Sequence, residues 1–380
     1  MLRQLAQKER NGVIAKIDKN MLLYRDKTPC ISETARYSDH LSADGDWTAS
    51  FWTGMVVMAG ALTGEAKYSD YLEGLLPFYQ NRLDFGWKDH DLGFLYQLYA
   101  LDAYRLTNDC RYAKMAVSAA ETLMHRYDPR GGFLRAWGKL IDPYRAGKLI
   151  IDCQLNLPLL FCAAQMSGND AMRTAAHRHA EATLNVVRAD GSTFHTFDFD
   201  CVTGKPLRGE TEGGFSDDSC WSRGQSWGIY GFYLAYFHTS DTRFLRTAET
   251  LADYFIARLD ENNMPKWDFK LPGGAPYPDA IDTSAAAIAA SALYDLSGVV
   301  SAEKAAAYVK AADAMLLSLI QNHSRVFDDG AEALLEKCYC GGVSPDGTPL
   351  VRQWSAIFGD YFYMEALMKK SGTPIHMWRL

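Results

Sequence analysis

Two aspartates stand directly before markedly apolar segments of this chain, where a carboxyl group can work as an acid or a base. Asp91 precedes the apolar segment 92–106, and Asp152 precedes the segment 155–166. Burial there would raise the pKa of one carboxyl group, so that it keeps a proton near neutral pH. Paired carboxylates of this kind are typical of acid–base chemistry on a glycosidic bond. Taken singly, each aspartate is also explained as a helix N-cap.

Tryptophan and arginine side chains accompany the carboxylates in the segments that lead into apolar helices. These segments are 45–52, 87–94, 149–154, 216–227, 278–283 and 350–354. Capping explains an Asp or Ser at such a place, but it does not explain Trp or Arg. Tryptophans offer flat apolar surfaces to sugar rings, although each one singly is more often a core residue. The candidates for such a surface are Trp47, Trp52, Trp137, Trp221 and Trp227.

One kind of join recurs along a chain whose periodicity is helical almost throughout. An apolar helix closes with Thr or Ser followed by Gly, Asn or Ser, and a polar, cap-like start follows. The copies are 62–68, 106–112, 166–172 and 238–244, with a looser fifth at 296–301. They begin 44 to 72 residues apart, which predicts a series of αα-hairpins separated by variable loops.

The helices before each join differ from those after it. Those before are rich in Ala, Gly, Leu and aromatic residues and are predicted as inner helices, at 52–62, 92–106, 155–166, 227–237, 284–296 and 353–369. Those after are amphipathic and are predicted as outer helices, at 68–82, 112–126, 172–187, 244–259 and 302–319, with the N-terminal helix through Tyr24 as the sixth.

Six inner and six outer helices predict an all-α fold, a closed (α/α)6 barrel that forms one domain over residues 1–380. Length alone allows two or three domains, and an open solenoid is the alternative architecture. In a closed barrel the inner helices run the same way, so their N-termini collect at one mouth together with Asp91 and Asp152. Converging N-termini create a local positive potential that suits an anionic ligand.

Composition and motifs exclude several other classes of protein. The net charge is −7, with no basic run for nucleic acid. No HExxH, paired CxxC, Walker or GxSxG motif occurs, and we expect neither a metal nor a cofactor. The first residues contain no apolar leader segment, and no long apolar run predicts a membrane span. Eight cysteines without a disulfide spacing therefore predict reduced thiols in a cytoplasmic protein. The oligomeric state is not predicted.

Several longer motifs together resemble those of the unsaturated glucuronyl hydrolases, glycoside hydrolase family 88. They are HDLGF at 90–94, IID at 150–152 with NLPLL at 156–160, and SDDSCWSRGQ at 216–225. Shorter matches at 193–195, 203–204, 207–211 and 358–367 extend the likeness over residues 46 to 368. The resemblance implies an (α/α)6 barrel, in agreement with the helix count.

The resemblance also implies a substrate and a reaction. The substrate is an oligosaccharide left by a polysaccharide lyase, with a 4,5-unsaturated uronic acid at its non-reducing end. An acid protonates carbon 4, water adds at carbon 5, and the resulting hemiketal opens and releases the partner sugar. By the resemblance, Asp152 is the general acid and then the base that takes a proton from water. Asp91 has a positioning or stabilising role beside it.

The uronate subsite is likewise implied by the resemblance, with Arg223 holding the carboxylate of the sugar. His195, in a Phe-His-Thr-Phe run, would by itself more often be a structural histidine, and the family context favours the subsite. The predicted substrate-binding residues are His195, Arg223, Trp227, Trp137, Trp47, Trp221 and Gln225.

Some positions depart from the family pattern. Gly213-Gly214 stands where several relatives carry Gln, and 338–343 lacks a Ser-x-x-Ser-x-Lys pattern, which argues against a strong preference for sulfated units. The related unsaturated rhamnogalacturonyl hydrolases, which act on pectin fragments, carry Arg-Gly-Asn-Gly-Trp where this chain has Arg-Gly-Gln-Ser-Trp at 223–227. The glycosaminoglycan type is therefore favoured, and a non-catalytic sugar-binding barrel is the other alternative.

Overall fold

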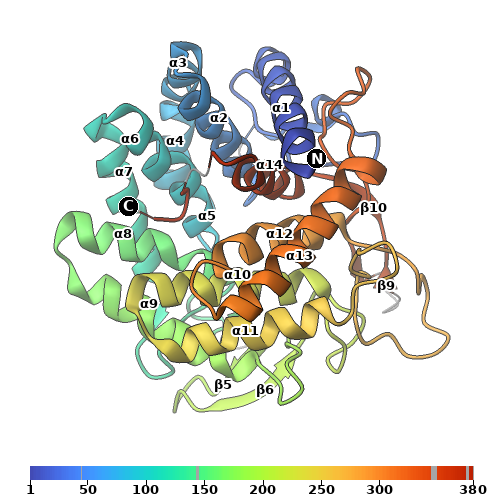
Figure 1. The fold of residues 1–380 in the computed structure, drawn as a ribbon. Helices are drawn as coiled ribbons and strands as arrows, with labels where there is room; N and C mark the ends of the chain where they lie inside the picture. The colour runs from blue at the N-terminus through green and yellow to red at the C-terminus, as the bar shows by residue number, and fades with distance from the viewer. Residues whose placement is uncertain (44, 143–144, 344–348, 374–375, 380) are drawn as a thin grey trace.

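The computed structural model describes residues 1–43, 45–142, 145–343, 349–373 and 376–379, with only the backbone of 342, 343 and 349 (Figure 1). The inner helices are α2 (Ala49–Thr63), α5 (Leu92–Tyr96) with α6 (Asp102–Thr107), α8 (Leu157–Ser167), α10 (Ser222–Thr239), α12 (Thr283–Leu296) and α14 (Ile357–Ser371). The outer helices are α1 (Leu2–Tyr24), α3 (Ala66–Gly74), α4 (Leu76–Phe85), α7 (Cys110–Met124), α9 (Asp170–Thr183), α11 (Thr242–Ile256) and α13 (Ala302–Ser318).

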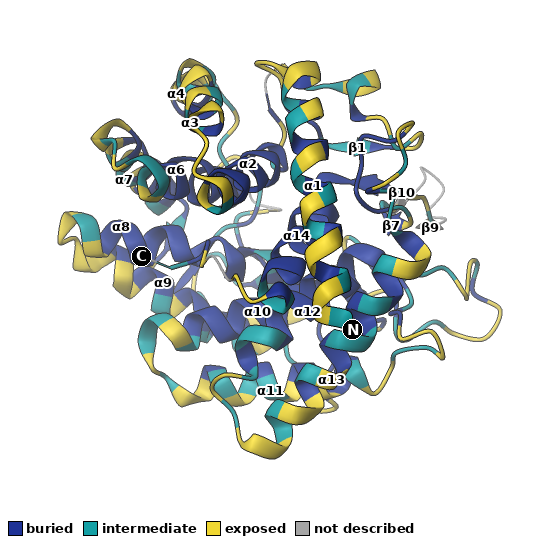
Figure 2. Cartoon of the chain, turned by 45° about the horizontal axis from the view of Figure 1, so that its top comes forward, coloured by how far each residue is buried: buried dark blue, intermediate teal, exposed yellow. Residues whose placement is uncertain are grey.

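The inner helices form a closed ring. Each contacts the next around the ring, and α14 contacts both α12 and α2, while α1 covers α14 and α2 from outside. The inner helices are buried on nearly all sides, whereas the outer helices have a buried and an exposed face (Figure 2). The predicted (α/α)6 barrel is confirmed, and closure excludes the open solenoid. The buried hydrophobic side chains join into one cluster that includes inner and outer helices, which supports the single predicted domain.

Four of the predicted joins share one hydrogen-bonded turn. The residue after each inner helix has a positive φ, at Gly64, Asn108, Gly168 and Ser240. In each, the preceding Thr or Ser hydroxyl donates to the carbonyl four residues back and accepts the amide two residues on. This explains the recurring Thr/Ser-Gly/Asn/Ser pair. The fifth join differs, because Ser297 has the right-handed φ of −58°.

Some predicted helices are shorter or divided. The predicted helix 353–369 begins only at Ile357, because 353–356 forms strand β10 (Gln353–Ala356), which pairs with β1 (Ile31–Ser32) and β7 (Cys338–Tyr339). The helix predicted over 92–106 contains a π-helical stretch at Gln97–Leu101, and the one predicted over 68–82 divides at Leu75, just before Pro77.

Short strands lie in the segments that connect an outer helix to the next inner helix, at the mouth of the barrel. One sheet has the order β4 (Lys148–Ile150), β5 (Thr196–Phe199), β6 (Pro206–Glu210), all antiparallel. Two hairpins pair β2 (Tyr127–Asp128) with β3 (Phe133–Leu134), and β8 (Gly342–Val343) with β9 (Pro349–Leu350). The register of the first sheet matters for the site, because it pairs Ile150 with Thr196.

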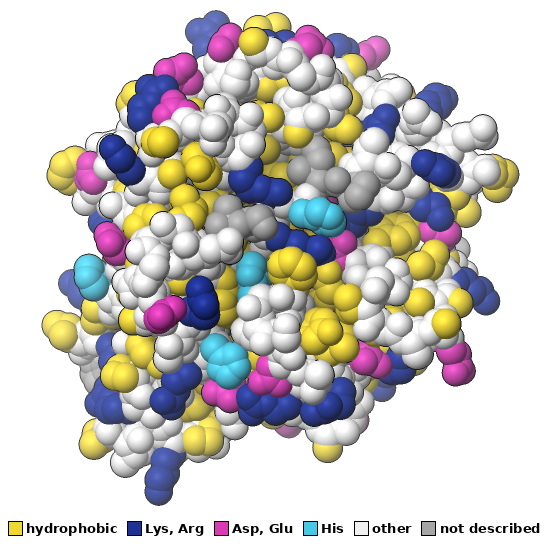
Figure 3. All heavy atoms as spheres, turned by 60° about the vertical axis from the view of Figure 1, so that its left-hand side comes forward, with side chains coloured by type: hydrophobic (Ala, Val, Ile, Leu, Met, Phe, Trp, Pro, Cys, Tyr) yellow, Lys and Arg dark blue, Asp and Glu magenta, His cyan; other side chains and the backbone are white. Residues whose placement is uncertain are grey.

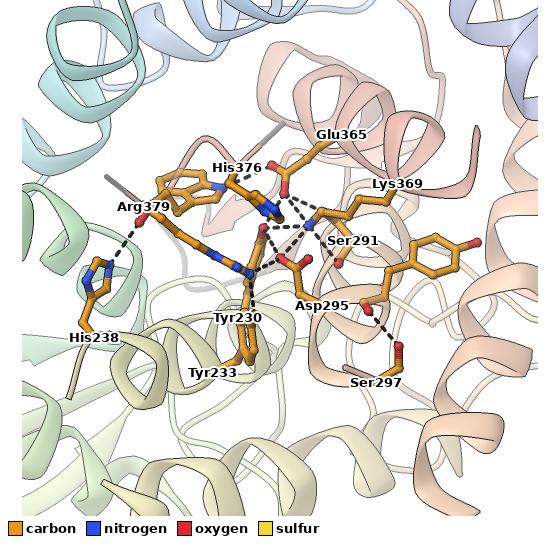
Figure 4. A network of polar contacts seen from close by, with 12 residues as sticks. Tyr230, Tyr233, His238, Ser291, Asp295, Ser297, Glu365, Lys369, His376 and Arg379 are labelled. Carbon is orange, nitrogen blue, oxygen red and sulfur yellow. Dashed lines mark hydrogen bonds and ion pairs between the residues drawn. The ribbon is translucent and has the colours of Figure 1, made fainter. Parts of the chain in front are cut away.

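The C-terminal tail lies at the end of the barrel where the inner helices finish. Trp378 is buried, its ring is stacked on Phe362 with 6.0 Å between centroids, and its Nε1 donates to Glu365 at 3.1 Å. Lys369 donates to Glu365 at 2.6 Å and to Asp295 at 2.9 Å (Figure 4). Figure 3 turns toward the reader the side of Figure 1 where the C-terminus lies, and Lys, Arg and His side chains gather near its middle. We call the ion-pair cluster of Asp295, Glu365 and Lys369, together with the tail residues 376–379 that lie over it, the floor of the barrel.

We predict that Trp378→Ala lowers the free energy of unfolding by about 3–5 kcal/mol, because a buried aromatic ring is removed from the centre of the floor. The measurement is thermal and urea unfolding followed by circular dichroism. The matched control is Trp87→Ala, since the Trp87 side chain is 56% exposed and its loss is expected to change the stability by less than about 0.5 kcal/mol. Equal effects of the two substitutions would contradict a structural role for the tail.

Candidate active site

Asp152 and His195 are brought together by the sheet at the mouth. Ile150 on β4 pairs with Thr196 on β5, and the amide of Ile151 donates to the carbonyl of His195 at 3.0 Å. The chain then turns into a short 3-10 helix, Ile151–Leu155, so that Asp152 Oδ2 lies 3.3 Å from His195 Nε2. Residues 43 positions apart in the sequence thus face each other because of strand register.

The imidazole of His195 has a defined orientation. Its Nδ1 accepts the backbone amides of Glu212 at 3.1 Å and Gly213 at 2.9 Å. A nitrogen that accepts two N–H groups carries no proton, so the neutral ring has its proton on Nε2, toward Asp152. Gly213, a departure from the family pattern, therefore takes part through its backbone.

Asp91 lies in a buried, acidic environment. Its side chain is 10% exposed, and burial, followed by the charges of Asp89 and Asp152, raises its pKa well above the usual range. His90 Nδ1 lies 3.4 Å from Asp91 Oδ1, and burial lowers the pKa of His90. Asp91 thus favours its protonated form more than an ordinary aspartate does, as expected for one member of an acid–base pair.

Neither Asp91 nor Asp152 acts as a helix cap. Both stand at helix starts, yet in the described part of the chain neither side chain accepts a capping amide of α5 or of the 3-10 helix. Side chains do cap α7, α9, α11, α12 and α13, and these are Asp109, Asn169, Asp241, Asp282 and Ser301. The structural explanation for the two aspartates therefore fails, and both carboxylates are free for other chemistry.

Arg223 lies in the first turn of α10 and joins several segments of the mouth. Its guanidinium donates to Asp282 at 2.9 Å and to the carbonyl of Tyr339 at 2.6 Å. The guanidinium carbon lies 4.4 Å from the ring centroid of Trp221 and 4.8 Å from that of Phe358. Its positive charge is therefore balanced by Asp282, and its role as a binder of the substrate carboxylate stays a prediction beside this structural one.

Aromatic contacts complete a circuit around the mouth. Trp221 lies beside His195 with 4.5 Å between ring centroids. Trp47, half-buried ahead of α2, is stacked on Phe358 at 5.4 Å and contacts Phe94 at 6.0 Å. The circuit thus passes through the starts of α2, α5, α8, α10, α12 and α14, as expected for parallel inner helices.

Several buried polar atoms around this circuit have no hydrogen-bond partner among the described residues. They are His90 Nε2, Asp152 Oδ2, His195 Nε2, Trp221 Nε1 and Arg223 Nε. Asp152 Oδ2 and His195 Nε2 are close to each other, but their geometry is not that of a hydrogen bond. Other buried polar atoms of the described chain also lack a partner, but these five lie together at the mouth, where a polar ligand can bond to them.

The structure does not bring every predicted residue to the mouth. Trp137 is half-buried there, 5.8 Å from the ring of His90. Gln225 is fully buried, and its amide donates to the carbonyls of Gly191 and Leu251, away from Arg223. Two residues of helix rotate a side chain by about 200°, which is why Arg223 and Gln225 face opposite ways.

Two tryptophans considered as sugar platforms lie in the core. Trp227 follows Arg223 by four residues, on the same face but about 6 Å deeper, and is fully buried between Phe94 and Phe362. Trp52 is buried and packs against Tyr24 and Tyr71. The burial of Trp52 and Trp227 supports the interpretation that both rings are core residues.

Some residues of the mouth carry no role in the sequence-based prediction. Asn156 accepts the amide of Phe94 and faces His90, and Asp282 pairs with Arg223. The signal for His90 and Asn156 is their place in the same motifs as Asp91 and Asp152. Nothing in the sequence marks Tyr339, whose hydroxyl donates to the carbonyl of Gly213 at 3.1 Å.

One group of described side chains away from the mouth has the spacing of metal ligands. It consists of His177, Glu181 and Asp241 on α9 and before α11. Arg243 already binds both carboxylates, at 2.6 Å each, so this group is an ion-pair cluster. Among the described helices, none is both long and apolar enough to cross a membrane.

The chain matches the model of Glycosyl Hydrolase Family 88 over residues 23–367. The unsaturated glucuronyl hydrolase of Bacillus sp. (strain GL1) is 35% identical over 361 residues, which are 92% of this chain and 93% of the relative. The unsaturated chondroitin disaccharide hydrolase of Streptococcus agalactiae serotype III (strain NEM316) is 37% identical over 336 residues, 85% of this chain and 81% of the relative.

Solved structures agree with these similarities. The crystal structure of the Bacillus sp. GL1 unsaturated glucuronyl hydrolase, described as responsible for the degradation of glycosaminoglycan, has a TM-score of 0.89 and 32% identity, and 99% of each chain is covered. An unsaturated glucuronyl hydrolase specific for heparin has a TM-score of 0.86 and 27% identity, with 97% of each chain covered.

We predict that Asp91→Asn raises the melting temperature, and that the gain grows with pH. The folded state holds the Asp91 proton to a higher pH than the unfolded state does, so the wild type loses stability as pH rises through that window. Asparagine cannot ionise and avoids this loss. The measurement is scanning calorimetry between about pH 4 and pH 9. Asp279→Asn, at a side chain 90% exposed, is the control, and a gain independent of pH would contradict the expectation.

Proposed function

This chain belongs to Glycosyl Hydrolase Family 88, and on that premise we propose that it acts on oligosaccharides released from glycosaminoglycans by polysaccharide lyases. It removes the 4,5-unsaturated glucuronic acid from their non-reducing end. The activities of the relatives from Bacillus and Streptococcus support this choice over pectin fragments.

One observation carries the proposal. Asp91 and Asp152 stand at helix starts without capping the helices, and they lie close enough for the charge of Asp152 to raise the pKa of Asp91. The mouth that holds them contains two oriented imidazoles, a paired arginine and half-buried tryptophans. A buried cluster of carboxylates lowers the stability of the protein, and a barrel that only binds sugar has no need for one. The burial of Asp91 among other carboxylates therefore favours a catalytic role.

In the proposed reaction Asp152 protonates carbon 4 of the enol ether. Its carboxylate then takes a proton from the water that adds at carbon 5, so that Asp152 recovers its proton as the hemiketal forms. His195 Nε2 lies 3.3 Å from Asp152 Oδ2 without a hydrogen bond between them, and a small reorientation in the substrate complex lets its N–H stabilise the carboxylate form of Asp152 between these steps. Asp91, which favours its protonated form, positions the sugar ring beside Asp152 as a hydrogen-bond donor.

The uronate ring lies in the circuit of the mouth. We place it against Trp47, Trp137 and Trp221, with Arg223 and the converging helix N-termini on the side of its carboxylate. Gln225 and Trp227 support α10 from within and do not contact the sugar. No cofactor takes part in this reaction.

Cytoplasmic location is part of the proposal. No disulfide joins the eight cysteines, all of which lie in the described part of the chain, and Cys153, Cys220 and Cys338 are among those that are buried, which suits a reducing compartment. One catalytic domain spans residues 1–380. Its substrate is the only partner that we propose.

We predict that the protein removes the ultraviolet absorbance of unsaturated disaccharides prepared by lyases from hyaluronan, chondroitin or heparin. Absorbance is lost because hydration destroys the conjugated double bond. A panel with and without sulfate measures the preference among these products. Persistence of the absorbance with every product would refute the enzyme proposal, and loss with the pectin product alone would assign the rhamnogalacturonyl activity instead.

We predict that Asp152→Asn reduces turnover by about 10²- to 10⁴-fold, because the general acid is lost. Its melting temperature stays close to that of the wild type, since the Asp152 side chain caps no helix. The control is Asp109→Ala, which removes a true cap far from the mouth. That variant is expected to lose about 1 kcal/mol of stability and to keep its turnover. A large loss of folding in Asp152→Asn would favour the cap interpretation.

A further inference from the structure

Asn156 lies where the two segments that carry the aspartates touch. It stands between the 3-10 helix of Asp152 and the first turn of α8, and it is fully buried. A Cβ added to Gly93 would lie 2.3 Å from Asn156 Cβ and 2.4 Å from its Cα. Only glycine permits this approach, so the backbone two residues after Asp91 packs directly on Asn156.

The hydrogen bonds of Asn156 set the orientation of its amide. Oδ1 accepts the backbone amide of Phe94, in the first turn of α5. The opposite end of the amide, Nδ2, therefore faces His90 Nδ1 at 3.3 Å. Because Nδ2 can only donate, His90 Nδ1 is the acceptor, and the neutral ring carries its proton on Nε2.

The same His90 nitrogen lies 3.4 Å from Asp91 Oδ1. Asn156, His90 and Asp91 thus form one buried group in which the amide is the fixed donor. The nearby Asn156 amide also lowers the pKa of Asp91 against the larger effects that raise it. Asn156 therefore acts on both the geometry and the ionisation of Asp91.

Charged and titratable groups face this group from every neighbouring element. Asp89 lies on the same loop, Asp46 ahead of α2, and Asp152 and Cys153 on the 3-10 helix. Arg126, after α7, His179, on α9, and His195 also face His90. Three carboxylates surround Asp91, and the Asn156 amide opposes their combined effect on it.

We propose that Asn156 is a positioning residue, which holds the His90–Asp91 pair against Asp152 by donating to His90 and accepting the amide of Phe94. Its role rests on the proposed function, because Asp91 and Asp152 are the residues that it positions. Asn156 itself does not touch the substrate.

The test compares Asn156→Ala and Asn156→Asp with the wild type in the disaccharide assay over a range of pH. Asn156→Ala loses both hydrogen bonds of the amide. Asn156→Asp keeps the acceptor for Phe94 but replaces the donor with another carboxylate. Both changes are expected to lower kcat by about 10- to 100-fold with little change in KM, since a buried hydrogen bond to an ionisable group is lost. The pH limb that depends on Asp91 moves upward by about one unit, and further in Asn156→Asp.

The matched control is Asn20→Ala. Asn20, on the outer helix α1, is also buried, and its Nδ2 donates to the carbonyl of Glu332 at 2.9 Å, outside the group of Asn156, His90 and Asp91. This variant is expected to lose stability while its kcat and pH profile stay those of the wild type. A pH profile of Asn156→Ala that superimposes on the wild type, or a loss of kcat no larger than that of Asn20→Ala, would overturn the proposal.

A measurement without substrate separates this inference from the proposed function. The aspartate carboxyl carbons are labelled with ¹³C, and the signal of Asp91 is assigned by its loss in Asp91→Asn. Its titration is expected to shift to higher pH in Asn156→Ala and in Asn156→Asp, whether or not any disaccharide is hydrolysed. An unchanged titration in both variants refutes the positioning role, even in an active enzyme.

Discussion

The parallel packing of six buried inner helices is the constraint on which the rest of the structure depends. Because all six run the same way, every N-terminus lies at the mouth and every C-terminus at the floor. Helix ends carry partial charges, positive at the N-terminus and negative at the C-terminus. Three carboxylates accordingly lie at the mouth, those of Asp91, Asp152 and Asp282. Lys369 and Arg379 lie at the floor, and each end also holds side chains of the opposite charge in ion pairs.

The two ends of the barrel use their charges differently. At the floor, Lys369 is compensated by Glu365 and Asp295, and the buried Trp378 covers the network. At the mouth, Asp282 is compensated by Arg223, but the charges that act most strongly on Asp91 are those of two other carboxylates, Asp89 and Asp152. The uncompensated carboxylates around Asp91 lower the stability of the folded state. The packing of the closed core and of the floor offsets this loss.

The two histidines of the mouth, His90 and His195, are both oriented by N–H groups that donate to Nδ1. Nδ1 of His195 accepts hydrogen bonds from two backbone amides, and Nδ1 of His90 accepts one from the side-chain amide of Asn156. Both rings therefore carry the proton on Nε2, and both Nε2 atoms lack a partner among the described residues. Each ring lies beside one of the aspartates, but through a different nitrogen: His195 presents Nε2 to Asp152, and His90 presents Nδ1 to Asp91.

The sequence by itself determined the barrel and the end of it that carries the chemistry. The repeated Thr/Ser-Gly/Asn/Ser turns are local structures, and the contrast between apolar and amphipathic helices is a property of composition, so both can be read without coordinates. Only the tertiary structure decided what each residue at the mouth does. Capping, the raised pKa of Asp91, the inward turn of Gln225 and the contact between Gly93 and Asn156 all depend on segments distant in the sequence. Their relative positions follow from strand register, helix phase and close backbone packing, which no local pattern encodes.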